Sequence, residues 1–131
     1  MAGPADAGRG GSATLSGRGP GFVVIYRWRL RAGREPSFIA AWSTITELLR
    51  RDHGSLGSRL HRGSDGLWYG YAQWPSDGVR RRAFAAPVDP AASAQMRAAV
   101  AESLPELVLE SVADYLVLAD AADRQGRAFR P

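Results

Sequence analysis

The side chains with the clearest chemical potential in this sequence are two histidines, His53 and His61. A histidine titrates near neutral pH, so it can take up or give a proton during a reaction. His53 follows a stretch of helical periodicity, where it is placed to interact with the terminal carbonyls of a helix. His61 lies in a predicted strand opposite Tyr69. The alternative is that His61 has no catalytic role and lies at an interface or is exposed to solvent.

Several other kinds of chemistry are excluded by what the sequence lacks. The chain has no cysteine, so disulfides, thiolate zinc sites and cysteine nucleophiles are excluded. The two histidines are far apart, and no carboxylate cluster has ligand spacing, so we expect no metal site. The sequence contains no Ser-His-Asp motif, phosphate loop or dinucleotide fingerprint. The early glycines, Gly8 to Gly11, precede no predicted helix.

Length and composition bound the kind of protein. The 131 residues suffice for one domain of ordinary size. All 17 basic residues are arginine, and lysine and asparagine are absent, which indicates a composition bias more than a design for binding. No stretch approaches the ~20 apolar residues of a membrane span, and the N-terminus lacks the apolar core of a signal peptide. We therefore expect a cytoplasmic protein without a membrane segment.

Glycine and aromatic residues divide the chain into a folded region and two tails. Residues 1–21 contain seven of the 15 glycines and no aromatic residue, so we expect a disordered N-terminal tail. Residues 119–131 are similar and form a predicted C-terminal tail. All four tryptophans and all four tyrosines lie in residues 22–118, the predicted domain. With 12 arginines against 10 acidic residues, this domain carries a net charge of only +2.

Hydrophobic periodicity within residues 22–118 predicts an α+β fold. The order is β-α-β-β-α-β, the ferredoxin-like arrangement of a four-stranded antiparallel sheet with helices on one face. We expect the second helix to be broken near Pro87 and to resume after Asp89-Pro90, with Met96, Val100 and Leu104 as its buried stripe. The predicted strands are Phe22 to Leu30, Ser55 to Arg62, Leu67 to Trp74 and Leu107 to Leu118; the predicted helices are Pro36 to about Asp52, a segment beginning near Ser76, and one closed by Pro105.

A hairpin signal at Gly63-Ser64-Asp65-Gly66 predicts which side chains share a face of the sheet. A three-residue loop with Gly66 in the left-handed region pairs His61 with Tyr69 and Arg59 with Tyr71. The face covered by helices then carries Leu56, Leu60, Trp68, Gly70, Ala72 and Trp74. The opposite face carries Arg59, His61, Tyr69 and Tyr71, and we expect it to include Tyr26 and Trp28 of the first strand.

Such an aromatic face needs a cover. Left bare, it would be too large an apolar patch for a soluble monomer. A second copy, a nucleic acid or a ligand can cover it. The RNA-recognition motif has the same strand order, and residues 69–74 partly match its third strand. However, Leu67 and Trp68 stand where that motif has a basic residue and a glycine, so a second copy of the chain is the better candidate.

The sequence resembles the antibiotic biosynthesis monooxygenase (ABM) domain, a family of the dimeric α+β barrel superfamily. The likeness is carried by Gly54-Ser55-Leu56-Gly57-Ser58, Asp65-Gly66 and Ala72-Gln73-Trp74-Pro75-Ser76. It implies a homodimer whose two sheets pack face to face into a barrel. It also implies a range of activities, because some members are monooxygenases of polycyclic phenols or quinols that need no metal or flavin. Others degrade haem or act as isomerases or lyases, so the fold does not settle the function.

A cofactor-free monooxygenase is the function that the resemblance favours, acting on or binding a small aromatic or polycyclic compound. It needs an apolar pocket and a group that takes a proton from the substrate. His61 is the candidate base, and the candidate binding residues are Trp28, Trp42, Arg59, Tyr69 and Tyr71. In these monooxygenases the pocket lies between sheet and helices, so Trp42, Trp68 and Trp74 are also placed to line it.

Two alternatives remain beside this function. One is a non-catalytic dimer that binds a small apolar ligand or has a stress-related role. The other is the RNA-binding module described above. Haem degradation is set aside, because residues 75–105 contain no histidine and Trp28 stands where that branch has an asparagine.

Overall fold

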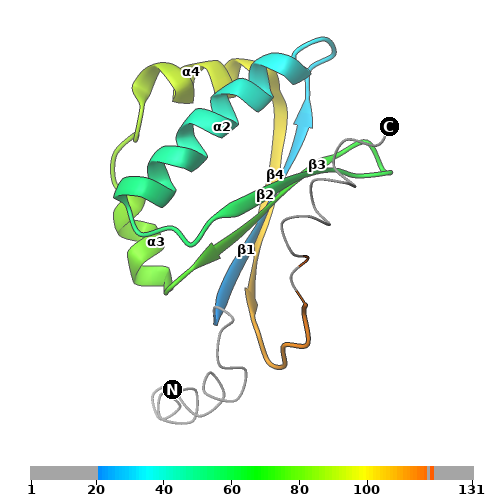
Figure 1. Cartoon of the computed structure of the whole chain (residues 1–131). Helices are drawn as coiled ribbons and strands as arrows, with labels where there is room; N and C mark the ends of the chain where they lie inside the picture. Colours follow the sequence, from blue (N-terminus) through cyan, green and yellow to red (C-terminus); the bar gives the residue numbers. More distant parts are fainter. Residues whose placement is uncertain (1–20, 118, 120–131) are drawn as a thin grey trace.

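The computed structural model describes residues 21–117 and residue 119, and it confirms the predicted α+β, ferredoxin-like fold (Figure 1). The four strands form an antiparallel sheet in the order β2-β3-β1-β4. Apart from Gly21 and Ala119, the predicted tails lie outside the described residues. The elements are β1 (Phe22–Leu30), α2 (Glu35–Asp52), β2 (Ser58–Arg62), β3 (Trp68–Trp74), α3 (Asp77–Ala83), α4 (Pro90–Ala99) and β4 (Val100–Glu110).

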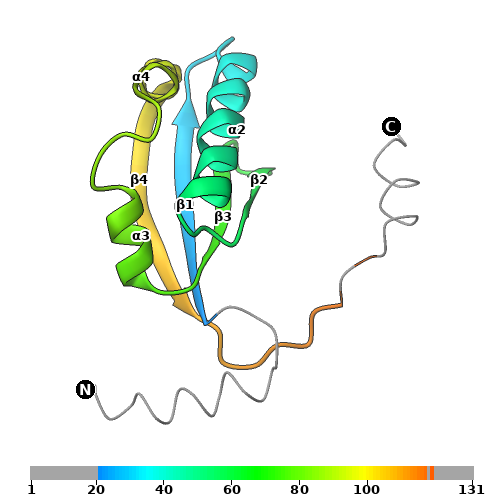
Figure 2. The ribbon, with the colours of Figure 1, turned by 60° about the vertical axis from the view of Figure 1, so that its left-hand side comes forward.

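The helices lie on one face of the sheet, as Figures 1 and 2 show. Helix α2 buries Phe38, Ala41 and Leu49 toward the sheet. The predicted break in the second helix is confirmed: Ser76 Oγ accepts a hydrogen bond from Val79 N at the start of α3, and α4 begins separately after Asp89. Within the described part of the chain, no helix is long and apolar enough to cross a membrane.

The predicted hairpin between β2 and β3 is confirmed. Gly66 has φ +87°, and Gly63 N donates to Leu67 O at 2.7 Å. His61 pairs with Tyr69 and Arg59 with Tyr71, as expected. Strand β2 is shorter than predicted, because Gly57 at φ +107° interrupts the extended backbone before Ser58.

The placement of Tyr26 and Trp28 on the open face is wrong. Tyr26 pairs with Gly70, and Trp28 pairs with Trp68. Directly paired residues point to the same side of a sheet, so both aromatic side chains lie on the face covered by helices. The open face instead receives the alternate residues of β1, including Ile25 and Arg27.

The boundary between α4 and β4 also differs from the prediction. The helix ends at Ala99 and the strand begins at Val100, so Val100 and Leu104 lie in the strand rather than on a buried helical stripe. Pairing with β1 decides this, since Leu30 pairs with Val100 and Arg27 with Leu104. Residues 111–117 are not part of a strand.

A β-bulge in β4 explains why a proline is tolerated there. Ile25 pairs with Leu107 and Arg27 pairs with Leu104, so Pro105 and Glu106 together lie opposite Tyr26. Strand β4 is an edge of the sheet, where a missing N–H costs little. Arg27 Nη2 and Nε donate to the Pro105 carbonyl at 2.7 and 3.1 Å and hold the bulge in place.

Two glycines with positive φ flank α2: Gly33 precedes the helix and Gly54 follows it. Gly54 has φ +83°, and a Cβ atom there would lie 2.9 Å from Val79 Cγ1, whereas Gly33 has φ +81° with open space around it. Gly33→Ala should lose only about 1 kcal/mol, the cost of the left-handed backbone. Gly54→Ala should lose about 2–3 kcal/mol, because it adds an overpacked contact. Urea unfolding of both variants measures the difference, and equal losses would contradict this packing.

Candidate functional site

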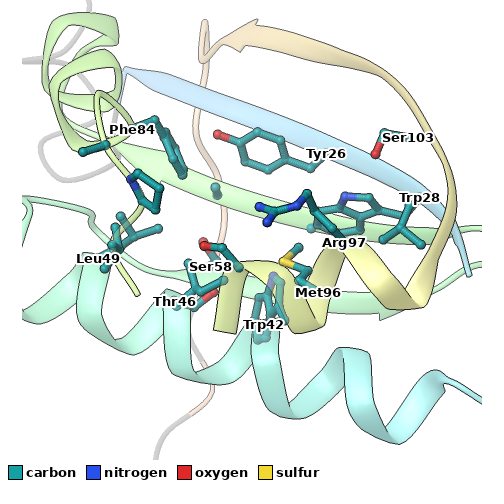
Figure 3. Close-up of a pocket in the computed structure, with 18 of the residues that line it drawn as sticks. Tyr26, Trp28, Trp42, Thr46, Leu49, Ser58, Phe84, Met96, Arg97 and Ser103 are labelled. Carbon is teal, nitrogen blue, oxygen red and sulfur yellow. The ribbon is translucent and has the colours of Figure 1, made fainter. Parts of the chain in front are cut away.

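A cavity of about 680 Å³ lies between the sheet and the helices. It is large enough for a drug-sized molecule. Figure 3 shows side chains from the sheet and from the helices facing one another across it. The strands form one wall of the cavity, with Tyr26, Trp28, Ser58, Gly70, Ala72, Trp74, Val100, Ala101, Glu102 and Ser103. The helices and the loop after α3 form the other wall, with Trp42, Ile45, Thr46, Leu49, Phe84, Ala85, Ala86, Pro87, Val88, Ser93, Met96 and Arg97.

Small residues in the middle of β3 make room for aromatic rings. A Cβ atom on Gly70 would lie 2.9 Å from Cη2 of Trp28, so the indole occupies the space that a side chain would take. Trp28 stacks on Tyr26 with ring centroids 6.1 Å apart and an interplanar angle of 18°. The two rings form a flat wall suited to planar apolar ligands.

The indole of Trp74 contributes a buried hydrogen-bond donor. Trp74 is 1% exposed, and its Nε1 makes no hydrogen bond of standard geometry within the described residues. It lies close enough to the Tyr26 hydroxyl to favour the phenolate slightly. A buried donor without an acceptor costs free energy, and the Tyr26 hydroxyl oxygen is the acceptor beside this N–H.

Tyr26 stays protonated at neutral pH. Burial is the main cause that raises its pKa above the usual 10.0, and the hydrogen bond and charge of Arg80 oppose that rise. Arg80 Nη1 donates to the Tyr26 hydroxyl oxygen at 3.4 Å. No described residue accepts the tyrosine's own proton, so Tyr26 is also a donor.

The charged residues of the cavity favour an anion. Figure 3 shows Arg97 reaching from α4 across the opening beside Trp28, and no described carboxylate pairs with its guanidinium. Glu102 is the only acidic lining residue among those described, and its carboxylate pairs with Arg29 at 3.1 Å. No described group of three His, Cys, Asp or Glu side chains could hold a metal ion.

The predicted site residues lie in three places. Trp28 and Trp42 line the cavity. Arg59 lies beside a shallow groove between α2 and β2, together with Trp42 and Trp68. His61, Tyr69 and Tyr71 share the open face of the sheet, on the opposite side from the cavity.

Sequence reasoning missed most of the polar groups of the cavity. Arg97 was not singled out, because one arginine on a helix carries no local signature. Tyr26 was assigned to the wrong face. Gly70 and Ala72 were the available signal, since two small residues in mid-strand require bulky side chains on the neighbouring strand as well as on the helix. Ser58, Thr46 and Ser103 have no pattern that predicts a cavity.

Two tyrosines should lose their phenolic protons at a higher pH than an ordinary tyrosine, for different reasons. The pKa of Tyr26 is raised chiefly by burial, and that of Tyr69 chiefly by its hydrogen bond to Asp65. In an ultraviolet titration of the tyrosines, Asp65→Asn should bring one late component back toward pH 10 and leave the other. Tyr26→Phe should remove the other. A single component lost in both variants would contradict these assignments.

The fold has counterparts among solved structures. The cofactor-independent oxygenase SnoaB from Streptomyces nogalater matches with a TM-score of 0.58 and 18% identity over 76% of this chain and 97% of that one. A candidate antibiotic biosynthesis monooxygenase from Chloroflexus aurantiacus matches with a TM-score of 0.59 and 17% identity over 72% and 95%. One from Deinococcus radiodurans gives 0.60 and 13% over 75% and 99%.

At the level of sequence the chain stands apart. No protein-family model matches it, and the comparison with curated proteins found no match. Identities of 13–18% to the three solved structures establish the fold alone. Within that limit, the resemblance read from the sequence is confirmed: the chain has the ferredoxin-like fold of the antibiotic biosynthesis monooxygenase domain.

Proposed function

We propose that this protein binds a planar, multi-ring phenol or its tautomer in the cavity and oxygenates it without a metal or flavin. The observation that carries the proposal is a cavity of about 680 Å³ with aromatic walls, several hydroxyl groups and an arginine that pairs with no carboxylate of the described residues. The fold that it shares with the cofactor-independent oxygenase SnoaB supports this chemistry.

The reaction draws its electrons from the substrate. The substrate loses a proton to give a carbanion or phenolate, and molecular oxygen adds to the ring carbon to give a peroxide anion. A proton then converts this to the hydroperoxide. Loss of water forms a carbonyl, so one oxygen atom enters the product and the other leaves as water. The protein supplies orientation and stabilisation of the anion.

Arg97 and Tyr26 are the residues assigned to the anion. The guanidinium favours a negative charge, and the tyrosine hydroxyl can donate a hydrogen bond to the substrate oxygen. Together they lower the pKa of the bound substrate, so that water can take its proton. His61, the base proposed from the sequence, lies beyond the sheet and has no part in this arrangement.

Oxygen uptake with anthrone tests the activity. Anthrone has three rings and one acidic carbon, and its oxidation to anthraquinone is followed with an oxygen electrode and by absorbance. Arg97→Met should lower kcat/KM about tenfold, since it removes one charge-assisted interaction. His61→Ala should stay within twofold of the wild type.

Arg50→Met is the matched control for Arg97→Met. Arg50 is exposed on α2 and does not line the cavity, so its removal should change little. Tight binding of anthrone without oxygen uptake would favour the non-catalytic alternative. A loss of activity in His61→Ala would return the role of base to His61.

We also propose that two copies of the chain pair through the open face of the sheet. Tyr69, Tyr71 and Ile25 lie on that face, and Leu107 and Leu109 of β4 are 47% and 44% exposed beside them. None of the helices α2, α3 and α4 of the described residues covers it (Figure 2).

The segment after β4 extends this apolar surface. Val112, Tyr115, Leu116 and Val117 are each at least 78% exposed. Exposed apolar area of this extent is typical of an interface, and a second copy would bury the face and the segment together.

Light scattering after size exclusion should give twice the chain mass of 14.1 kDa. Tyr71→Asp combined with Leu109→Asp should yield monomers, because both changes bury unpaired charge at the interface. Ile39→Asp, an exposed apolar position on α2, is the control and should remain dimeric. A monomeric wild type would overturn the dimer and favour the RNA-binding alternative.

A further inference from the structure

The β-bulge of β4, the first turns of α3 and the middle of β1 meet at one arginine. Arg80 Nη1 lies 3.0 Å from Glu106 Oε2, and Nη2 lies 3.2 Å from Asp77 Oδ1. Its side chain is only 14% exposed. Both carboxylates are about 40% exposed, so they face solvent while the guanidinium is turned inward.

The position of Glu106 depends on the bulge. The pairing of β1 with β4 leaves Pro105 and Glu106 opposite Tyr26. A regular strand would place one residue there. The extra residue brings the Glu106 carboxylate to the guanidinium, which in turn donates to the Tyr26 hydroxyl.

This arrangement determines which role the Tyr26 hydroxyl can play. Its oxygen already accepts a hydrogen bond from Arg80, and a hydroxyl has one proton to give. No described residue accepts that proton. Tyr26 lines the cavity, and its hydroxyl points toward Phe84, another lining residue (Figure 3), so a ligand oxygen bound between them can accept the proton.

We propose that Tyr26 donates a hydrogen bond to the oxygen of the bound ligand and that Arg80 is the positioning residue that aims this donor. Asp77 and Glu106 hold Arg80 in turn. The proposal rests on the proposed function only in requiring that an aromatic ligand occupies the cavity.

The ligand class that this donor selects is an aromatic with a hydroxyl or carbonyl oxygen, in preference to a hydrocarbon of the same shape. The preference is expected to be about tenfold, the value of one hydrogen bond in a buried site. Shape and apolar contact contribute equally to both kinds of ligand, so the ratio of their affinities isolates the hydrogen bond.

The experiment compares 1-naphthol with 1-methylnaphthalene, with Kd measured by quenching of tryptophan fluorescence. Tyr26→Phe should remove most of the preference for naphthol and leave the affinity for methylnaphthalene within twofold. Arg80→Met should reduce the preference about threefold, and Arg80→Lys should restore part of it. Arg82→Met, an exposed neighbour on α3, should change neither affinity.

The outcomes separate this proposal from the proposed function. If the wild type binds neither compound, the cavity is not a site for aromatic ligands and both proposals fail. If it binds both and Tyr26→Phe keeps the preference, Tyr26 is not the donor, and the proposed function keeps only Arg97 as the residue assigned to the anion. If Arg80→Met weakens both affinities alike, Arg80 supports the fold only and its positioning role is overturned.

Discussion

The space above Gly70 and Ala72 in β3 is the constraint on which the rest of the site depends. A close-packed interior would fill it with side chains. Here Trp28 occupies part of it, and a Cβ atom at Gly70 would meet that indole at 2.9 Å. The remaining volume stays open because Trp42 and Met96 close it only from the helical side. A larger residue in mid-strand would therefore remove both the flat aromatic wall and the cavity.

The two faces of the sheet carry different side chains. The alternation of side chains along β1 sends Tyr26 and Trp28 to the cavity and Ile25 and Arg27 to the open face. The cavity and the exposed apolar face are thus separated by the thickness of one sheet. His61, the base predicted from the sequence, pairs with Tyr69 on the open face and so lies across the sheet from the cavity.

The sequence predicted the fold well and the site only in part. Strand β1 and the hairpin were predicted correctly, because alternation and the Gly66 turn are local signals. The face of Tyr26 and the start of β4 were not, because both depend on pairing between strands distant in sequence. Helical spacing of Met96 and Val100 was misleading, since the ladder with β1 outweighs local propensity. A cavity is the volume that side chains leave empty, and no short motif encodes it.

The bulge at Pro105 connects these observations. Proline removes a backbone donor, so it is confined to edges or irregularities of a sheet. In β4 it marks one of two irregularities in the pairing with β1, the one at which Pro105 and Glu106 both oppose Tyr26. Because Glu106 follows directly, the irregularity brings a carboxylate to Arg80 on the side where the tyrosine hydroxyl lies. The sequence predicts that Pro105 ends a helix. In the folded chain Pro105 instead lies in the bulge that brings Glu106 to Arg80, and Arg80 orients the Tyr26 hydroxyl.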